Sequence, residues 1–368
     1  MDTQIAQKSG ESTGAFTPWL VGLVGLAFVG YIAFGLLSGA DWNPTALIKF
    51  GESNGALREY AEEHFGDVVL AGGKGHDGKF FFIQASDPFY LEPDENAFLL
   101  DRPTYRAQRM LYPTVAGGFG MFSPGVTAWM LVILNIVAVG AGTYLTSRVA
   151  MVLGLSPLFG LAFLINPGVF VSSVIDTAEV FAMVFLMAGI LLAIERKHTS
   201  AAVLFTLSAL SRETMLLCAI GWVFFELVHS RKVRWEMSLP FLAVGAWWLY
   251  LRVRIGNLAD GVQDVRALGA PFEGLANAFQ DWVSRPEKLD DLIVGLALVG
   301  IFVFFAYLAF TRRSLIPLMA AGFGLVGILM VDEVWISYFD SSRALTPLIT
   351  LFFLAVPFSL RPHSGRIV

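Results

Sequence analysis

Several carboxylates stand beside apolar or aromatic sequence, where their chemistry would be unusual. Asp77 lies in "GHDGKFFFIQ", between His76 and the turn-forming Gly78, close to three phenylalanines. Asp41 directly follows the first long apolar run, and Asp87 precedes a proline. A carboxylate held among aromatic side chains that exclude water can act as a general base. We therefore predict Asp77 as the catalytic carboxylate, with Asp41 and Asp87 as further candidates.

Each of these residues also has a structural interpretation. Asp-Gly is a strong turn signal, so residues 76–78 are also compatible with a β-turn in a short hairpin. Asp87 before a proline is typical of a turn or a helix cap, and Asp41 of a polar residue at a helix boundary. His76 is expected to hydrogen-bond to Asp77, because no second histidine stands nearby at the spacing of a metal site.

Arginines form the second chemically suggestive group. The planar guanidinium can bond to two oxygens at once, which suits it to a phosphate whose negative charge grows during a reaction. Arg212 and Glu213 interrupt an apolar run directly, and an ionisable residue within a membrane segment suggests function by default. Each arginine is also compatible with a snorkelling or topology-setting role, and Glu213 with neutralising Arg212. The conspicuous arginines, together with the acid beside one of them, are Arg102, Arg106, Arg109, Arg212, Glu213 and Arg343.

The remaining reactive residues limit the chemistry further. Asp176 and Glu179 are three residues apart, which places them on one face of a helix. Cys218 is the only cysteine, so neither an intrachain disulfide nor a thiolate metal cluster can form. Nothing in the sequence requires a metal or a cofactor, and none is predicted. Nucleic acid is set aside as a partner, because no basic stripe with interleaved aromatics occurs.

Membrane helices are the elements that must position these side chains. The chain has 368 residues, of which 56% are hydrophobic and 15% charged, with a mean hydropathy of +0.65. A soluble domain usually carries about 25% charged residues. Several apolar runs approach the ~20 residues that cross the hydrocarbon core of a bilayer. The sequence predicts an all-α polytopic membrane protein.

We expect about ten transmembrane helices, with boundaries uncertain by ~2 to 4 residues. The segment 199–230 is either one long tilted helix or two short halves broken at "SRET" (211–214). The broken pair keeps the basic "RKVR" (231–234) on the same face as the other basic connections. The apolar runs span 18–40, 126–147, 149–166, 168–194, 199–210, 214–230, 236–253, 290–311, 314–331 and 344–360.

Five basic groups fall on one face, which the positive-inside rule makes cytoplasmic: Arg148, "ERKH" (195–198), "RKVR" (231–234), Arg312 with Arg313, and Arg361 with Arg366. Asp77, Arg212 and Arg343 are then expected on or near the outer face. The first loop then lies outside, and its apolar and aromatic content indicates a folded domain rather than a linker. A second outer segment is predicted to hold an amphipathic helix on the membrane surface. The expected organisation is a cytoplasmic N-terminus (1–17), a first transmembrane helix (18–40), an extracytoplasmic loop domain (41–125), a transmembrane bundle (126–253), an extracytoplasmic amphipathic segment (254–289), C-terminal transmembrane helices (290–360) and a cytoplasmic tail (361–368).

The first loop also carries a family resemblance. "GHDGKFFFIQASDPF" followed by "YRAQRMLYP", with a later "ALSRET" and "SRALTPL", is similar to bacterial membrane proteins of the polyprenyl-phosphate-sugar-dependent C-type glycosyltransferase (GT-C) superfamily. Those proteins typically show a "DG-aromatic-aromatic" turn and a "YR-x-QR-x-x-YP" box in the first outer loop. The strong part of the match covers about 40 residues. The resemblance implies a multi-spanning helical fold whose first extracytoplasmic loop carries the catalytic acid.

The resemblance implies an inverting glycosyltransferase of the inner (cytoplasmic) membrane, with its active site facing outward. A sugar on a lipid phosphate already has a good leaving group. Transfer therefore needs one carboxylate to take the acceptor proton, and not the acid and base pair of glycoside hydrolysis. The departing phosphate gains charge, and the resemblance implies that the set of arginines with Glu213 given above binds the lipid phosphate. The expected partners are a polyprenyl-phosphate-linked sugar donor and the lipid bilayer, and the acceptor stays open between a glycan, a lipid and a protein. A lipid or solute transporter or flippase, with buried ionisable residues along its path, and a non-catalytic membrane scaffold are the alternatives.

Overall fold

Helices make up nearly all of the regular structure in the computed structural model, which describes residues 5–53, 55–256 and 268–359. The N-terminal third contains one long helix and a group of short elements. These are α1 (Ile5–Ser38), α2 (Thr45–Ile48), β1 (Phe50–Gly51), α3 (Gly55–Phe65), β2 (Leu70–Ala71), α4 (Gly78–Ser86), α5 (Pro93–Asn96), η1 (Ala97–Leu99), α6 (Pro103–Arg106) and α7 (Leu111–Phe119).

The rest of the chain supplies most of the long helices. Its middle third comprises α8 (Pro124–Val152), η2 (Pro157–Gly160), α9 (Leu161–Leu164), α10 (Pro167–Val174), α11 (Ala178–Ile194), α12 (His198–Ser211), η3 (Glu213–Met215), α13 (Leu216–His229), η4 (Trp235–Ser238) and α14 (Leu239–Ile255). The last third comprises α15 (Glu273–Ser284), η6 (Pro286–Lys288), α16 (Leu289–Thr311), α17 (Leu315–Leu329), α18 (Asp332–Trp335), α19 (Tyr338–Ala344) and α20 (Thr346–Ser359).

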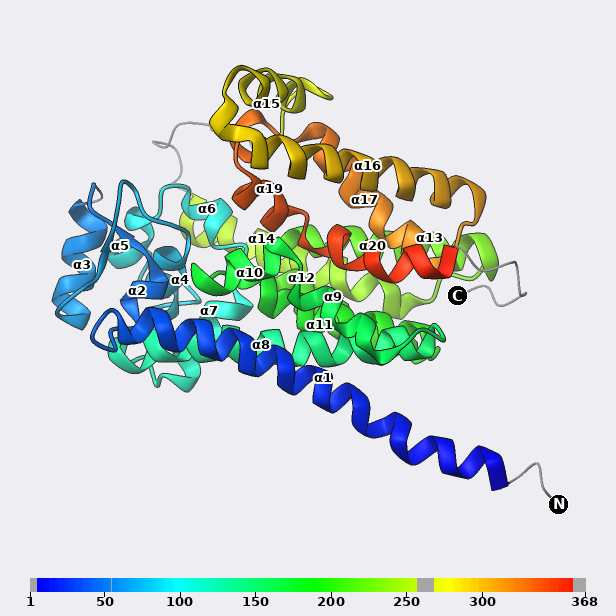
Figure 1. The fold of residues 1–368 in the computed structure, drawn as a ribbon. Helices are drawn as coiled ribbons and strands as arrows, with labels where there is room; N and C mark the ends of the chain where they lie inside the picture. The colour runs from blue at the N-terminus through cyan, green and yellow to red at the C-terminus, as the bar shows by residue number, and fades with distance from the viewer. Residues whose placement is uncertain (1–4, 54, 257–267, 360–368) are drawn as a thin grey trace.

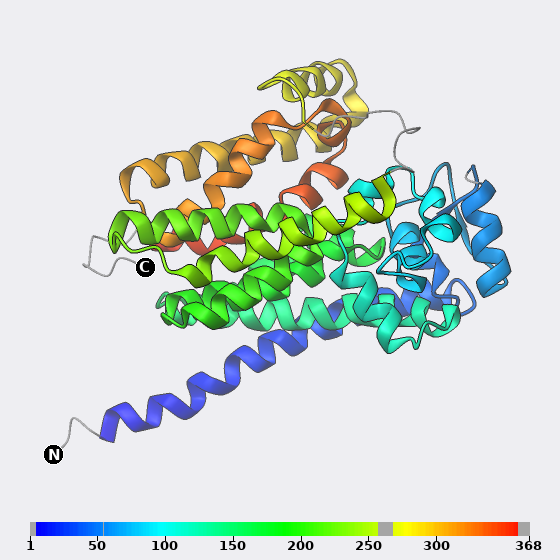
Figure 2. The same cartoon turned by 180° about the vertical axis from the view of Figure 1, so that it is seen from behind.

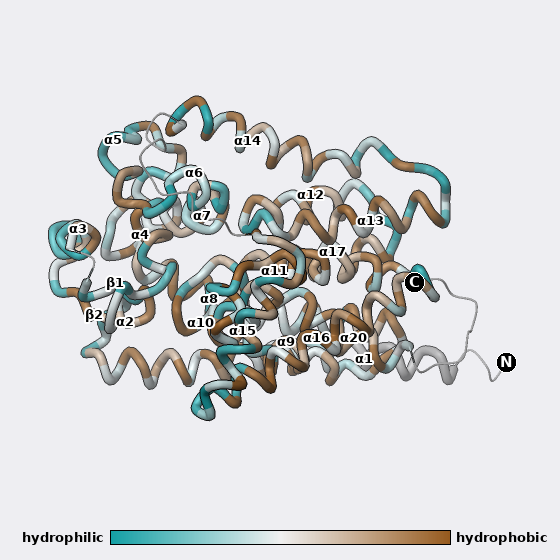
Figure 3. Tube along the Cα trace, turned by 90° about the horizontal axis from the view of Figure 1, so that it is seen from above, coloured by the Kyte–Doolittle hydropathy of each residue, from teal (hydrophilic) through white to brown (hydrophobic). Residues whose placement is uncertain are grey.

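The long helices run roughly along one direction, with the short elements α2 to α7 gathered at one end (Figures 1 and 2). Helix α1 packs against α8, α11 packs against both α8 and α12, and α13 packs against α17. Apolar residues dominate the long helices, whereas hydrophilic residues gather around α3 and α5 and at several helix ends (Figure 3). The protein is therefore an apolar helical bundle with a more polar group of elements at one end.

Among the residues that the structure describes, three helical segments are long and apolar enough to cross a membrane, and the count rises to five if each of two bent helix pairs is one span. The three are Thr17–Ser38, Pro124–Val152 and Pro286–Thr311. The predicted number of about ten spans is not confirmed. Helix α12, for example, has 14 residues, so it is about 21 Å long, whereas the hydrocarbon core of a bilayer is about 30 Å thick.

The two bent pairs are joined to each other at their breaks. Helices α9 and α10 bend by 53°, and α19 and α20 bend by 69°. Asn166 caps α10, because its side-chain oxygen accepts from the Gly168 N–H at 2.9 Å, and Pro167 occupies the first helical position. The Asn166 amide also donates to the Thr346 carbonyl and the Thr350 hydroxyl, both at 2.9 Å. One buried side chain thus links the break before α10 to the start of α20, directly after the break that follows α19.

The short elements at the end of the bundle share a hydrophobic core of their own. Phe80, Phe81 and Phe82 are buried in it, together with residues of α7 and of the adjoining part of α8. Helix α14 holds these elements in place, since the Trp247 indole donates to the Ala107 carbonyl at 2.9 Å and the Tyr250 hydroxyl to the Phe89 carbonyl at 2.7 Å. The aromatic run therefore packs a helix-rich subdomain.

Two local predictions have clear outcomes. The hairpin interpretation of residues 76–78 is wrong, because α4 begins at Gly78 and the two short strands β1 and β2 pair in parallel elsewhere. The break at residues 211–214 is present: α12 ends at Ser211, and α13 begins after one turn of 3₁₀ helix. Residues 257–267 of the predicted amphipathic segment lie outside the described residues, and α15 forms its helical part.

Candidate functional site

Asp77 stands immediately before α4, where its backbone is already helical. Its neighbour Gly78 is required by close packing, since a Cβ there would lie 2.6 Å from the Ile48 carbonyl oxygen and 2.7 Å from that of Ile175. The Asp77 side chain makes no capping hydrogen bond to its own helix. It is instead directed to cations from other elements.

Two arginines from distant parts of the sequence contact Asp77. The Arg106 Nη1 lies 2.9 Å from the Asp77 Oδ1, and the Arg343 Nη2 lies 2.9 Å from the Oδ2. Arg106 comes from α6 and also holds Asp101 through bonds of 2.8 and 3.0 Å. Arg343 comes from α19, which packs against α10. Both oxygens of the predicted base are therefore paired with guanidinium groups.

Glu179 continues this chain of charges into the bundle. Its Oε1 lies 3.4 Å from the Arg343 Nε and forms a short ion pair with Arg212. Asp340 pairs with Arg343 at 3.2 Å from within the same helix. Signs alternate along the chain Asp101, Arg106, Asp77, Arg343, Glu179, Arg212. We call these six residues, with Asp340, Arg109 and Glu213, the arginine–carboxylate network.

Arg109 and Glu213 form a further pair beside this chain, with Nε–Oε2 and Nη2–Oε1 distances of 3.2 and 3.3 Å. The Arg109 Nη2 also donates to the Tyr105 hydroxyl at 2.6 Å. The Tyr105 ring lies near three guanidinium groups, with its centroid 4.9 Å from the Arg102 Cζ, 5.8 Å from that of Arg106 and 4.9 Å from that of Arg109. Cation–π attraction accounts for this grouping.

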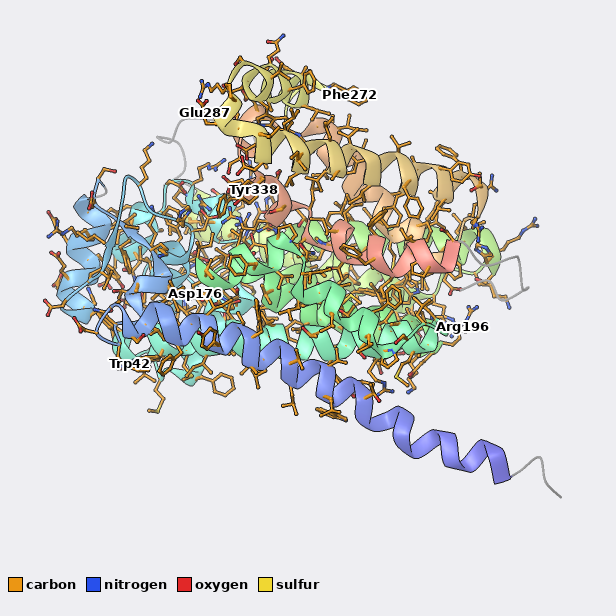
Figure 4. All side chains as sticks on the ribbon, viewed as in Figure 1. Trp42, Asp176, Arg196, Phe272, Glu287 and Tyr338 are labelled. Carbon is orange, nitrogen blue, oxygen red and sulfur yellow. The ribbon has the colours of Figure 1, made fainter. Side chains whose placement is uncertain are left out.

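Burial differs strongly along the network. The Glu179 side chain is 1% exposed and that of Asp77 is 17% exposed, whereas Asp101 and Asp340 are each 47% exposed. In Figure 4, Asp176, three residues before Glu179, and Tyr338, at the start of α19, lie toward the end that carries α2 to α7, whereas Arg196 lies at the other end. Solvent therefore reaches the part of the network beside Asp77, whereas Glu179 is its most buried carboxylate.

Electrostatics at Asp77 strongly favour its ionised form. Burial alone would raise the pKa of this carboxyl, but Arg343 and Arg106, reinforced by Arg109 and Arg212, outweigh burial and hold the pKa well below its usual range. Next to it, burial and the cation Arg343 lower the pKa of His76. The only charged carboxylate that contacts both Arg106 and Arg343 is thus Asp77, among the residues that the structure describes.

The structure brings together six of the nine predicted site residues: Asp77, Arg106, Arg109, Arg212, Glu213 and Arg343. Asp87 ends α4 and accepts from the Leu91 and Glu92 N–H groups at 2.9 and 2.8 Å, so it caps a turn. Asp41 is exposed beyond α1, and no ion pair joins it to the network within the described ranges. Arg102 contacts the Tyr105 ring at the start of α6. Glu213 pairs with Arg109, and the partner of Arg212 is Glu179.

Some members of the network were not among the predicted site residues. Asp101, Glu179 and Asp340 are further carboxylates that pair with predicted arginines. Glu179 carried a usable signal, since it is an acid in the first turn of a strongly apolar helix. The expected hydrogen bond from His76 to Asp77 does not form in the structure; the His76 backbone N–H donates to the Lys49 carbonyl at 3.0 Å.

These observations define an all-α, membrane-embedded protein whose helices enclose an arginine–carboxylate network at one end. Comparison of the chain with known protein families, with curated proteins and with solved structures finds no match.

Proposed function

We propose that the protein is a membrane glycosyltransferase that moves a sugar from a polyprenyl-phosphate donor to an acceptor on the extracytoplasmic side of the inner membrane. The single observation that carries this proposal is the contact of Asp77 with both Arg106 and Arg343. A carboxylate between two guanidinium groups supplies both functions that inverting transfer from a lipid phosphate needs. These are a base for the acceptor hydroxyl and donors for the leaving phosphate.

The donor phosphate is proposed to bind Arg343 and Arg106 in place of part of their contact with Asp77. Each arginine keeps another carboxylate when Asp77 moves, because Arg106 also holds Asp101 and Arg343 also holds Glu179 and Asp340. Neither cation is then left without a partner. Guanidinium groups bond phosphate through two parallel N–H donors, and the charge that develops on the leaving phosphate strengthens these bonds.

Donor binding would also make Asp77 a better base. With both arginines engaged, its pKa lies far below the operating pH, and a carboxylate with such a low pKa accepts protons poorly. A phosphate anion that takes over the arginines removes most of the cause of this shift, so the pKa of Asp77 returns toward the usual value of about 3.9 or above it. The acceptor hydroxyl would lose its proton to Asp77 as its oxygen bonds to the sugar carbon and the lipid phosphate leaves.

A lipid or solute transporter is the second candidate, and the two bent helix pairs favour it. Discontinuous helices that meet near an ionisable cluster are a recurring arrangement at transporter binding sites. In that case Arg343 and Arg212 would bind an anionic group, and Asp77 would release it instead of acting on a hydroxyl. The two functions share anion binding and differ in whether a glycosidic bond is broken.

The test uses purified protein in liposomes with farnesyl-phosphate-linked hexoses as donors. We expect release of farnesyl phosphate that depends on Asp77 and Arg343, together with a thermal shift caused by farnesyl phosphate alone. Arg58→Ala is the matched control, because Arg58 pairs with Glu62 on an exposed face of α3, away from the network. Binding without release, accompanied by movement of the lipid between leaflets, would favour the transporter, and absence of binding would reject both functions.

A further inference from the structure

A second buried polar group lies directly behind the network. Tyr112 of α7, Asn135 of α8 and Asp176, in the turn between α10 and α11, are each 1% exposed or less. The Asp176 Oδ1 lies 2.6 Å from the Tyr112 hydroxyl and 2.6 Å from the Asn135 Nδ2. Tyr112 belongs to the "YRAQRMLYP" segment, and none of the steps proposed above uses it.

With an ionised Asp176, the group has one proton too few for its four short contacts. The Tyr112 hydroxyl lies 2.9 Å from the Leu131 carbonyl oxygen as well as 2.6 Å from the Asp176 Oδ1. A hydroxyl has one proton and can donate to only one of these acceptors. The two N–H groups of the Asn135 amide serve the Tyr112 oxygen at 2.8 Å and the Asp176 Oδ1 at 2.6 Å.

A neutral Asp176 satisfies every one of these contacts. Its carboxyl O–H donates to the Tyr112 oxygen, and the Tyr112 O–H is then free to donate to the Leu131 carbonyl. The Asp176 Oδ2 is buried and has no hydrogen-bond partner among the described residues. A buried, unpartnered oxygen costs far less on a neutral acid than on a carboxylate. Hydrogen-bond geometry and burial therefore agree on the protonated form.

Asp176 also determines the placement of two network carboxylates. Its backbone has a φ of 53°, in the left-handed region, and its carbonyl oxygen and that of Ile175 pack against Gly78, the residue after Asp77. Glu179 follows three residues later in the first turn of α11. The turn that Asp176 fixes thus touches both the outer and the inner carboxylate of the chain of charges.

We propose that Asp176 is a positioning residue held as a neutral carboxylic acid, and that loss of its proton turns the Tyr112 O–H from the Leu131 carbonyl to Asp176 and leaves a buried negative charge in the turn that touches Asp77 and Glu179. The effect on sugar transfer rests on the proposed function, whereas the buried proton does not. The other titratable groups that face this region are Tyr112 from α7, His76, Asp77 and Lys79 around the start of α4, and Glu179 of α11 with its partners Arg212 and Arg343.

The pH range for a test follows from the same group. Asp176 lies outside the candidate spans, and burial raises its pKa to about 6, opposed by the hydrogen bonds from Tyr112 and Asn135. The neutral form therefore predominates in mildly acidic solution and is lost above this pH. Asp176→Asn keeps the shape of the side chain and removes the titration.

Infrared spectroscopy of the purified protein, with ¹³C-labelled aspartate, tests the inference without any transfer assay. We expect a neutral carboxyl C=O band at pH 5 that disappears by pH 8 and is absent in Asp176→Asn. Relative to Asp176→Asn, the thermal midpoint of the wild type should fall from about pH 4 to about pH 6 and stay level above it, because only the folded state keeps this proton within that range. Asp340 is the other aspartate of the described residues whose pKa is raised. A band retained in Asp340→Asn and Asp77→Asn therefore points to Asp176 even if Asp176→Asn does not fold.

The outcomes separate this inference from the proposed function. A band that persists in Asp176→Asn, a band lost in Asp340→Asn, or no titrating band in the wild type would overturn the role of Asp176. A titrating Asp176 band in a protein that releases no farnesyl phosphate would reject the glycosyltransferase and leave the buried proton in place.

Discussion

Replacing Asp77 with asparagine should abolish most of the activity while leaving the protein folded. Asp77→Asn removes the charge, but Arg106 keeps Asp101 at 2.8 Å and Arg343 keeps Asp340 at 3.2 Å and Glu179 at 3.4 Å. The Asp77 side chain is also 17% exposed, so water can approach the freed guanidinium groups. We expect a loss of at most about 2 kcal/mol in the free energy of unfolding, the order of one charge-assisted hydrogen bond.

The effect on turnover should be much larger. Loss of a general base typically costs ~10² to 10⁴ in rate, so release of farnesyl phosphate should fall by that factor. Binding of farnesyl phosphate should persist or strengthen, because the anion no longer competes with a carboxylate for Arg343 and Arg106. Release is followed in liposomes, and binding is followed as a thermal shift in detergent micelles.

Glu179→Gln provides the contrast that makes this prediction specific. Glu179 is 1% exposed, and within the described residues it is the ion-pair partner of Arg212 as well as a partner of Arg343. Removing one member of a buried pair costs about 3 to 5 kcal/mol, because the remaining charge stays buried. The unfolding midpoint should therefore fall much further in Glu179→Gln than in Asp77→Asn. Equal losses in the two variants, or full activity in Asp77→Asn, would refute the reasoning.

Four further predictions follow from individual contacts. The stability difference between wild type and Asp77→Asn should stay constant from pH 7 down to about pH 4 and shrink only in stronger acid. The pKa of Asp77 is lower in the folded protein than in the unfolded chain, where it is about 3.9. The ionised carboxylate therefore stabilises the fold above the unfolded pKa, and this stability is lost as the pH falls toward the folded pKa. Thermal unfolding across this range measures it, and a difference already lost at pH 5 would contradict it. Arg343→Lys should keep the fold but weaken farnesyl phosphate binding by about tenfold, since a lysine lacks the planar fork; unchanged affinity in a titration would count against direct phosphate contact. Gly78→Ala should destabilise the protein by about 1 to 3 kcal/mol, because the new Cβ would meet two backbone carbonyls, whereas Gly30→Ala, with open space around it, should not. Asn166→Leu should lower the thermal midpoint and reduce phosphate binding together, because Asn166 ties the start of α10 to the start of α20, directly after the helix that carries Arg343.

The sequence predicts much of the site because charge in apolar surroundings is unusual in itself. Arg212 stood out inside an apolar run, and the structure buries it against Glu179. Asp77 and Arg106 were identified from one loop, where a short separation in sequence made proximity plausible. Asp77 and Arg343 are separated by most of the length of the sequence. Their contact was suggested only by the prediction that both residues lie near the outer face of the membrane. Topology can indicate that residues share a face, but it cannot pair individual side chains.

The parts that sequence reasoning missed depend on packing in three dimensions. Periodicity detects apolar runs, so the helical segments were found, but it does not show that α9 and α10 form a bent pair around Asn166. The Asp-Gly signal suggested a β-turn, yet Gly78 is needed because two backbone carbonyls approach its Cα, and its helix follows at once. A glycine that permits close packing and a glycine that permits a turn look identical in one sequence.

The balance of charge explains why the arginines and the carboxylates of the network must be considered as one unit. Four arginines, Arg106, Arg109, Arg212 and Arg343, face five carboxylates, Asp77, Asp101, Glu179, Glu213 and Asp340, so the network among the described residues is already close to neutral. An anionic donor that simply added to it would meet carboxylates at every guanidinium group. The donor must therefore displace a carboxylate, and Asp77 is the one whose two cations both keep other partners.

The other carboxylates are less suited to being displaced by the donor. Loss of Glu179 from its ion pair would leave Arg212 buried without that carboxylate. Asp101 and Asp340 each contact only one of the two arginines that hold Asp77. On the proposed mechanism, phosphate binding and release of the base are then one exchange at Arg106 and Arg343, so Asp77 becomes available to an acceptor only when a donor is in place.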